Sequence, residues 1–306
     1  MKTAKILVTG SSGTIGTELC EQLLARNYQV TGFDLKPNNW LSAVNERTVI
    51  GDLRDPSSLD ALSGNWDVVV HLAANARVYN LVLNPLLARD NLEMVVNVLE
   101  FVRRRKIPKI IFASSREVYG NNRQFKCSEN APVRVDNCES PYAASKLGGE
   151  ALIHAYHHCY GLDYIILRFS NVYGKYDDSD RLIPQLIRLA KANKELPIYG
   201  KRKRLGFTYI DDAVNGIIET LERFEDAEND VFNIASGEAV SILHVASLIK
   251  KYMRTHNKVA LADTRTGEVV RFVADITKAK RKLGYKPKTG IELGIRKSVQ
   301  WSTQTK

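Results

Sequence analysis

The stretch Thr9-Gly-Ser-Ser-Gly-Thr-Ile-Gly16 decides the fold of this chain. It lies between the apolar run Lys5-Ile-Leu-Val-Thr9 and a helical pattern that begins at Thr14, so it forms the turn from a strand into a helix. Glycines at such a turn let the backbone approach a pyrophosphate, and the helix N-terminus offers free N–H groups to it. The stretch therefore predicts nucleotide binding by Gly10, Gly13, Thr14, Ile15 and Gly16.

Apolar, β-branched runs alternate with helical patterns through the first half of the chain. Strands are expected at 5–9, 28–33, 48–50, 67–71, 109–113 and 164–168, with helices at 14–26, 87–105 and 141–160. This alternation is typical of an α/β fold with a doubly wound parallel sheet of Rossmann type. Later in the chain we expect a helix at 182–192, a strand, helix and strand at 207–210, 212–223 and 231–234, and three helical stretches with little strand over 236–306.

We expect two domains. Residues 1–170 plus 208–235 form the dinucleotide-binding Rossmann domain, and residues 171–207 plus 236–306 form a smaller, discontinuous C-terminal α/β domain that binds the substrate. Ligands in folds of this type bind outside the carboxyl ends of the strands. The cleft between the two domains is therefore the expected active site.

The 306 residues carry a net charge of +10. No apolar run reaches the roughly 18 residues of a transmembrane helix, and the N-terminus is interpreted as a first strand rather than a signal peptide. The four cysteines lack metal-like or redox-like spacing, so we expect reduced thiols in a cytoplasmic protein and no metal. The positive charge is compatible with nucleic acid or an anionic substrate. No basic stretch is interleaved with aromatic residues, so no nucleic-acid partner is expected. Without a transmembrane run, no membrane partner is expected either.

Asp34 ends the second expected strand, 24 residues after Gly10. A carboxylate there accepts hydrogen bonds from both ribose hydroxyls and repels a 2′-phosphate, which favours NAD over NADP. Lys36 nearby instead favours NADP over NAD. Asp52 and Leu53 follow the third strand, where Asp52 either bonds the adenine amino group or is an ordinary turn residue.

Tyr142 and Lys146 are four residues apart in an expected helix, so both side chains leave the same face. A phenol has a pKa of about 10, and a nearby cation lowers that pKa. The pair therefore predicts a tyrosine that acts as a general base near neutral pH. The spacing alone is common by chance, but here it follows a nucleotide-binding start.

Further motifs occur in order along nearly the whole chain. They are His71-Leu-Ala-Ala74, Ser114-Ser-Arg-Glu-Val-Tyr-Gly120, Arg168-Phe-Ser-Asn-Val-Tyr-Gly174, Gly267-Glu-Val-Val-Arg271 and Ala274-Asp-Ile-Thr-Lys-Ala-Lys280. Together with the glycine stretch and the tyrosine–lysine pair, they resemble the NAD-dependent epimerase/dehydratase family, the extended short-chain dehydrogenases. Within that family the chain is most similar to the UDP-glucose 4-epimerases.

The resemblance implies roles on the cofactor side of the site. Ser115 completes a catalytic triad with Tyr142 and Lys146, with Ser114 as the competing assignment, and Lys146 also holds the nicotinamide ribose. His71 packs below the cofactor rather than acting as a base. The residues expected to border the cofactor are Leu72, Ala73 and Ala74.

On the substrate side, the resemblance implies that Asn171 bonds a diphosphate. This chain has Leu205 where the family has an arginine that contacts the nucleotide. The neighbouring Arg204 is therefore expected to make this contact; the alternative is that Arg204 belongs to a solvated run of Lys and Arg. Phe272 is expected beside the sugar. The other expected substrate contacts are Glu117, Arg265, Glu268 and Arg271, of which the two arginines suit phosphate oxygens.

In the family the common first step is oxidation at sugar C4, with NAD as the hydride acceptor. The resemblance implies 4-epimerisation of a UDP-sugar, either UDP-glucose/UDP-galactose or UDP-glucuronate/UDP-galacturonate, through a transient 4-keto sugar. Glucuronate decarboxylases and sugar 4,6-dehydratases carry a glutamate in the place of Glu117, which keeps both as alternatives, whereas Arg116 matches neither. Glu117 is otherwise a solvated or ion-paired turn residue.

Two further expectations remain open at this point. A non-catalytic nucleotide-sensing or RNA-binding module is a remote alternative, against which the intact Ser115, Tyr142 and Lys146 argue. The resemblance also implies a homodimer, in which the helices at 87–105 and 141–160 pair across a two-fold axis; the alternative is that these helices only cover the sheet.

Overall fold

The computed structural model of the protein describes residues 4–121 and 126–304. Within these residues, seven parallel strands form the main sheet in the order β12-β7-β5-β4-β1-β2-β3. They are β1 (Lys5–Thr9), β2 (Gln29–Asp34), β3 (Thr48–Ile50), β4 (Val68–His71), β5 (Lys109–Ser115), β7 (Asp163–Phe169) and β12 (Asp230–Ile234). The predicted α/β fold of Rossmann type is confirmed. The strand order reverses between β1 and β4, which is where such folds bind ligands.

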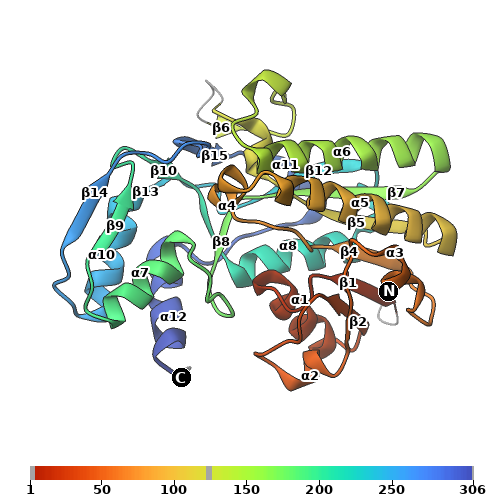
Figure 1. Cartoon of the computed structure of the whole chain (residues 1–306), viewed down its shortest axis with the longest axis horizontal. Helices are drawn as coiled ribbons and strands as arrows, with labels where there is room; N and C mark the ends of the chain where they lie inside the picture. Colours follow the sequence, from red (N-terminus) through yellow and green to blue (C-terminus); the bar gives the residue numbers. More distant parts are fainter. Residues whose placement is uncertain (1–3, 122–125, 305–306) are drawn as a thin grey trace.

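Helices cover both faces of this sheet (Figure 1). Helices α1 (Thr14–Ala25) and α8 (Ile210–Glu222) pack on one face, while α5 (Leu86–Arg105) and α6 (Pro141–Tyr160) pack on the other. Successive side chains of a strand point to opposite faces, and each face of the sheet therefore builds its own hydrophobic core. The short helices are α2 (Ser42–Asn45), α3 (Pro56–Asp60), α4 (Val78–Leu83), α9 (Phe224–Ala227), η1 (Arg116–Tyr119) and η2 (Val135–Asn137).

A smaller part of the molecule lies beside the main sheet, at the left of Figure 1. Its helices are α7 (Leu182–Lys191), α10 (Ile242–Met253) and α12 (Ile291–Gln304), while α11 (Thr277–Leu283) packs near β12. Its strands form three small sheets. The first has the order β13 (Val240–Ser241), β10 (Arg204–Leu205), β15 (Arg271–Ala274) and β6 (Lys126–Cys127). The second pairs β11 (Phe207–Tyr209) with β8 (Asn171–Tyr173), and the third pairs β14 (Val259–Ala262) with β9 (Leu196–Tyr199). The exact division of residues between two domains stays a prediction.

The structure corrects two details of the expected elements. The expectation of little strand over 236–306 missed β13, β14 and β15, because strands of two to four residues that pair with distant segments leave no local periodicity. The strand expected at 207–210 ends at Tyr209, and it pairs with β8 rather than with the main sheet.

An aromatic cluster joins the smaller part to the nucleotide-binding half. The ring of Tyr176 lies 6.0 Å from that of Trp40 and 5.9 Å from that of Trp301, centroid to centroid. The neighbouring Lys175 pairs with Glu18 of α1 at 2.7 Å. The segment that follows β8 is therefore anchored on both sides before it enters α7.

No helix among the described residues is long and apolar enough to cross a lipid bilayer. Val96 of α5 and Tyr160 of α6 are exposed. The homodimer expected through these two helices stays a prediction.

His71, at the end of β4, makes stability depend on pH. The imidazole is fully buried, its Nδ1 lies 2.7 Å from the Thr9 hydroxyl, and burial, with the Lys146 charge, lowers its pKa to about 3. The unfolded chain binds the proton with a pKa of about 6.5, so stability is complete above that pH and falls as the pH drops toward 3, by up to about 1.4 kcal/mol per pH unit.

We therefore expect the wild-type protein to lose about 2 kcal/mol more unfolding free energy between pH 7 and pH 5 than His71→Asn, which cannot titrate. Urea denaturation at the two pH values measures this difference. Equal losses in the two proteins would mean that His71 is not held neutral by burial.

Candidate active site

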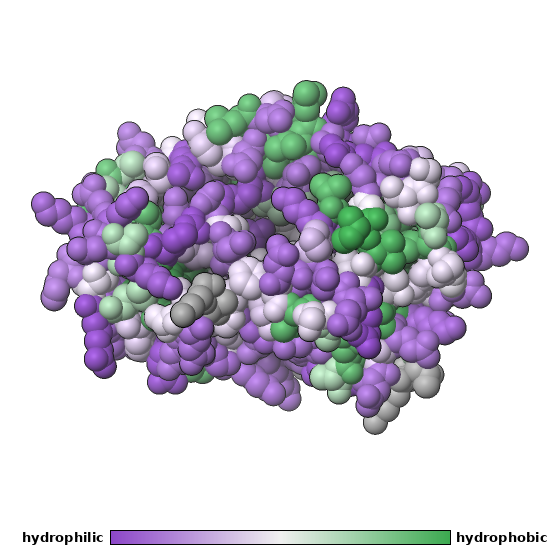
Figure 2. Space-filling model, turned by 60° about the horizontal axis from the view of Figure 1, so that its bottom comes forward, coloured by the Kyte–Doolittle hydropathy of each residue, from purple (hydrophilic) through white to green (hydrophobic). Residues whose placement is uncertain are grey.

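A cavity of about 520 Å³ opens at the carboxyl ends of the main-sheet strands, between the sheet and the smaller part. On the surface, a hollow lies near the middle of the face shown in Figure 2, and hydrophilic side chains surround most of it. The cavity is lined by the glycine stretch, by Ser115, Tyr142 and Lys146, and by several charged residues of the smaller part. The cofactor loop and the expected catalytic residues thus share one enclosed space.

The glycine stretch has the backbone geometry that a bound pyrophosphate needs. Gly10 has a φ of +77°, and a Cβ there would meet the Ala73 nitrogen at 2.7 Å; a Cβ on Gly16 would meet the Gly10 oxygen at 2.0 Å. Helix α1 begins after Gly13 with no side chain capping it and no acidic residue in its first turn. Its N–H groups remain available to an anion, so this loop fits a dinucleotide.

Asp34 ties the glycine stretch to the end of β2. One carboxylate oxygen accepts a hydrogen bond from the Ser12 N–H at 2.9 Å, and the other accepts one from the Lys36 N–H at 3.1 Å. Lys36 thus contributes its backbone to the position of Asp34. Asp52 pairs with Arg54 at 2.6 Å, which holds the pKa of Asp52 below its usual range. Leu53 beside it is buried, and neither aspartate lines the main cavity.

Helix α6 presents the expected catalytic pair, Tyr142 and Lys146, to the cavity. Ser140 caps the helix by accepting the Ala143 N–H at 3.2 Å, and Pro141 opens the first turn. Tyr142 therefore sits at the helix start with Lys146 one turn later, and both are buried at the cavity wall.

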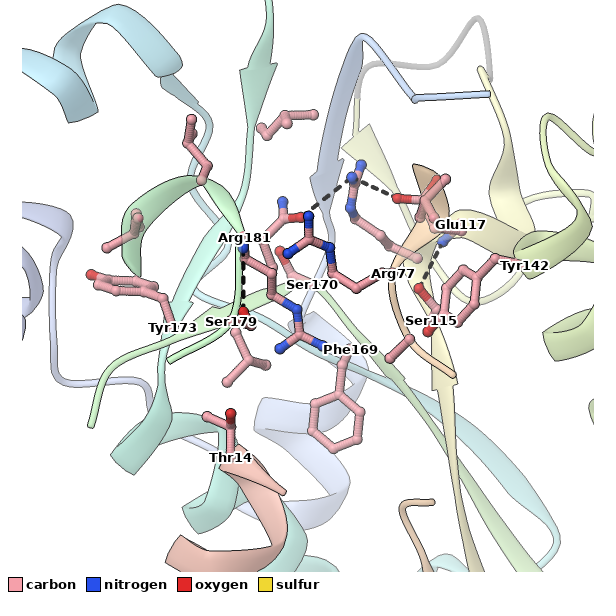
Figure 3. A pocket seen from close by; sticks show the side chains of 18 of the residues that line it. Thr14, Arg77, Ser115, Glu117, Tyr142, Phe169, Ser170, Tyr173, Ser179 and Arg181 are labelled. Carbon is pink, nitrogen blue, oxygen red and sulfur yellow. Dashed lines mark hydrogen bonds and ion pairs between the residues drawn. The ribbon is translucent and has the colours of Figure 1, made fainter. Parts of the chain in front are cut away.

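The two adjacent serines of β5 have different surroundings. Ser115 lies beside Tyr142 at the cavity wall, as Figure 3 shows, and its hydroxyl accepts a hydrogen bond from the Glu117 N–H at 3.2 Å. Ser114 instead donates to Glu150 of α6 at 2.5 Å, and Glu150 pairs with Arg168 at 2.6 Å in the buried interior. Ser115 is thus the serine that meets the tyrosine.

The expected electrostatic tuning of Tyr142 differs in the structure. Burial raises the pKa of the Tyr142 phenol, opposed by its hydrogen bond with Ser115 and by the charge of Arg181. Burial also lowers the pKa of Lys146 to about 8, and its Nζ donates to the Ala113 carbonyl at 2.8 Å. Burial thus opposes the charged form of both groups, and the lowering of the phenol pKa by Lys146 stays a prediction.

Arg116 and Glu117 of η1 form a buried ion pair of 2.7 Å beside Ser115. Arg116 also donates to the Asn171 side-chain oxygen at 3.4 Å. Burial raises the pKa of Glu117. Glu117 is therefore ion-paired rather than solvated, and it lines the cavity together with Asn171.

At the other end of the cavity, Lys203 is buried and forms an ion pair with Glu268. The guanidinium of Arg265 lies 3.7 Å from the ring centroid of Tyr199 and 4.8 Å from that of Tyr79. All of these residues line the cavity. This end therefore combines two cations, a carboxylate and two aromatic rings.

Three residues expected to contact substrate do not line the cavity. Arg204 is exposed and donates to the Ala239 carbonyl at 3.3 Å, and Arg271 is also exposed. Phe272 is buried against the Tyr119 ring, 5.6 Å away centroid to centroid, so its expected place beside the sugar was wrong. Lys203 directly precedes β10, and the alternation of neighbouring side chains places Lys203 and Leu205 at the cavity and Arg204 outside it.

Sequence reasoning missed two arginines of the cavity, Arg77 and Arg181 (Figure 3). Arg77 precedes α4 and Arg181 precedes α7. Both are loop arginines whose proximity arises only from the fold, although loops that follow sheet strands are frequent places for binding residues. Among the described residues, no group of three His, Cys, Asp or Glu side chains could hold a metal ion.

The fold and the cavity define a dinucleotide-binding enzyme whose cavity wall contains a buried tyrosine, Tyr142. The chain belongs to the NAD dependent epimerase/dehydratase family, whose model matches residues 6–235. The predicted family is confirmed, and NAD is the cofactor.

Known relatives share this fold along almost the whole chain. UDP-glucuronate 4-epimerase 1 of Arabidopsis thaliana is 32% identical, covering 97% of this chain and 76% of that protein. The Thermus thermophilus UDP-glucose 4-epimerase in complex with NAD has a TM-score of 0.90 at 27% identity, covering 98% of this chain and 99% of that one. A UDP-N-acetylglucosamine 4-epimerase of Methanobrevibacter ruminantium, in complex with UDP-N-acetylmuramic acid, has a TM-score of 0.89 at 29% identity, with 100% of both chains covered. These relatives share epimerisation at C4 and differ in the sugar.

Proposed function

We propose that the protein catalyses NAD-dependent 4-epimerisation of a UDP-sugar. The observation that carries this proposal is the single cavity that holds the glycine stretch, the pair of Tyr142 and Ser115, and the cationic far end around Lys203 and Arg265. The glycine stretch fits NAD, and the other two features fit a nucleotide sugar. Its reacting sugar lies at the tyrosine, and its nucleotide lies at the cations and aromatic rings.

Tyr142 is the general base in this mechanism, and it takes the proton from the sugar O4. Ser115 hydrogen-bonds the same oxygen and orients it, and Lys146 holds the ribose next to the nicotinamide. Bound NAD supplies the capacity to accept a hydride from C4 and to return it. The 4-keto sugar then turns in the cavity, so that C4 is reduced on its opposite face. Tyr142 returns its proton to O4.

The buried ion pair of Arg116 and Glu117 supports epimerisation over the two alternatives. Dehydration and decarboxylation require a side chain that moves a proton or stabilises charge elsewhere on the sugar. Glu117 is engaged by Arg116, and no second carboxylate is adjacent in η1. We therefore propose that the 4-keto sugar is reduced again rather than diverted.

Parallel incubation with UDP-glucose, UDP-glucuronate and UDP-N-acetylglucosamine tests this function, with the product configuration read by NMR. We expect at least one of them to be converted to its C4 epimer without net consumption of NAD. A UDP-pentose would instead indicate decarboxylation, and a 4-keto-6-deoxy sugar would indicate dehydration. Failure to convert any nucleotide sugar would contradict the proposal.

A further inference from the structure

Glu117 is a buried carboxylate that the proposed mechanism does not use. It lies on the same side of the cavity as Ser115 and Tyr142 (Figure 3), and its N–H donates to the Ser115 hydroxyl at 3.2 Å. One of its carboxylate oxygens pairs with Arg116 at 2.7 Å. The other is buried, and no donor within residues 4–121 and 126–304 reaches it. Arg116 is therefore the residue that occupies this carboxylate.

The fold holds Arg116 against Glu117. The same guanidinium nitrogen that pairs with Glu117 donates to the Asn171 side-chain oxygen at 3.4 Å. Asn171 is fixed in turn, because its side-chain amide donates to the Gly206 carbonyl at 2.7 Å. The guanidinium also lies over the Phe272 ring, 5.6 Å from its centroid. The network around the ion pair thus limits the freedom of Arg116 to leave Glu117.

The charge of Arg116 weakens Glu117 as a base. Burial raises the pKa of Glu117, and the charge of Arg116 is the largest influence that opposes this rise. A carboxylate with a raised pKa takes up a proton more readily when it is ionised. Pairing with Arg116 stabilises the ionised form and so lowers the basicity of Glu117.

A strong base in this place would damage a 4-keto sugar. The hydrogens on C3 and C5 are acidic because they are next to the carbonyl, and loss of either proton gives an enolate whose charge rests on O4. Hydrogen bonds from Tyr142 and Ser115 to O4 would stabilise that enolate. The sugar would then lose its configuration at C3 or C5 before C4 is reduced.

We propose that Arg116 is a positioning residue that keeps Glu117 from removing a proton next to the ketone, so that only C4 is inverted. The inference rests on the proposed function and deepens it, because it assigns the fidelity of the reaction to one ion pair.

Without Arg116, a proton passes from C3 or C5 to the Glu117 carboxylate, and the electron pair of the broken C–H bond moves to O4. A proton from the solvent then returns to the same carbon and restores the ketone. Reduction at C4 follows as in the wild-type protein. The side reaction therefore exchanges one carbon-bound hydrogen with solvent and involves no net oxidation or reduction.

The test uses D2O and a UDP-sugar that the wild-type protein epimerises, with deuterium in the products located by NMR and mass spectrometry. Arg116→Met removes the charge and keeps apolar bulk against Phe272. We expect exchange at C3 or C5 to be at least about 100-fold more frequent per turnover than in the wild-type protein, the lower end of what a positioned base contributes. The double variant Arg116→Met with Glu117→Gln should return exchange to the wild-type level.

Arg134→Met is the matched control, because Arg134 forms its ion pair with Asp136 on the surface; its products should be those of the wild-type protein. Arg116→Lys keeps a charge beside Glu117 but lacks the forked guanidinium, so its exchange should lie between the wild-type and Arg116→Met levels. This variant carries the test if thermal unfolding shows that Arg116→Met does not fold.

Wild-type exchange in folded Arg116→Met, or in Arg116→Lys where only that variant folds, would overturn the inference and leave the proposed function in place. Exchange that persists in the double variant would also overturn it, since a loosened cavity rather than Glu117 would then move the proton. If the wild-type protein forms no C4 epimer from any UDP-sugar, the proposed function fails, and the inference fails with it.

Discussion

Tyr142→Phe is expected to lower kcat by about 10²- to 10⁴-fold, the range that positioned proton transfer contributes. The change deletes only the hydroxyl, so the ring keeps its buried place at the start of α6 and the hydrogen bond with Ser115 is lost. Steady-state kinetics on every sugar that the wild-type protein converts gives the size of the effect.

Tyr160→Phe is the matched control, because Tyr160 ends the same helix and is exposed. NAD content and thermal unfolding are measured in both variants, so that a loss of cofactor or fold is recognised. Wild-type turnover by a folded, NAD-loaded Tyr142→Phe protein would exclude the tyrosine as the base.

Glu150→Ala is expected to lower the free energy of unfolding by about 3–5 kcal/mol, the usual effect of removing one partner of a buried ion pair. Glu150 pairs with Arg168 at 2.6 Å and accepts the Ser114 hydroxyl, and all three residues are buried. The variant leaves Arg168 charged in the interior without its carboxylate partner. Urea denaturation measures the change.

Asp136→Asn serves as the comparison, since Asp136 pairs with Arg134 entirely on the surface and its loss should leave stability unchanged. The double variant Glu150→Ala with Arg168→Met should recover part of the loss, because it removes the buried charge as well. A Glu150→Ala effect as small as that of Asp136→Asn would mean that solvent reaches the buried pair.

The part of the fold that follows from local patterns was predictable. The glycine stretch stands directly between a strand and a helix, and the strands of the main sheet are buried apolar runs, so both carry a signal within a few residues. Tyr142 and Lys146 were recognisable because one helical turn brings them to the same face.

The rest depended on register and on distant contacts. Ser114 and Ser115 are consecutive residues, as are Lys203 and Arg204, and a shift of one position in an extended segment exchanges the inner and outer faces. Arg77 and Arg181 line the same cavity only because the fold brings two loops together. The direction of the Tyr142 pKa followed from burial, which the spacing to Lys146 could not reveal.

The most direct measurement follows the hydrogen on C4 of the substrate. Wild-type protein is incubated in ordinary water with UDP-[4-²H]glucuronate and with UDP-[4-²H]glucose, and the products are analysed by NMR and mass spectrometry. If C4 is oxidised and reduced within one binding event, the C4 epimer keeps its deuterium at C4. Inversion at C4 with loss of the deuterium to water, or products with C4 unchanged, would contradict NAD-dependent 4-epimerisation.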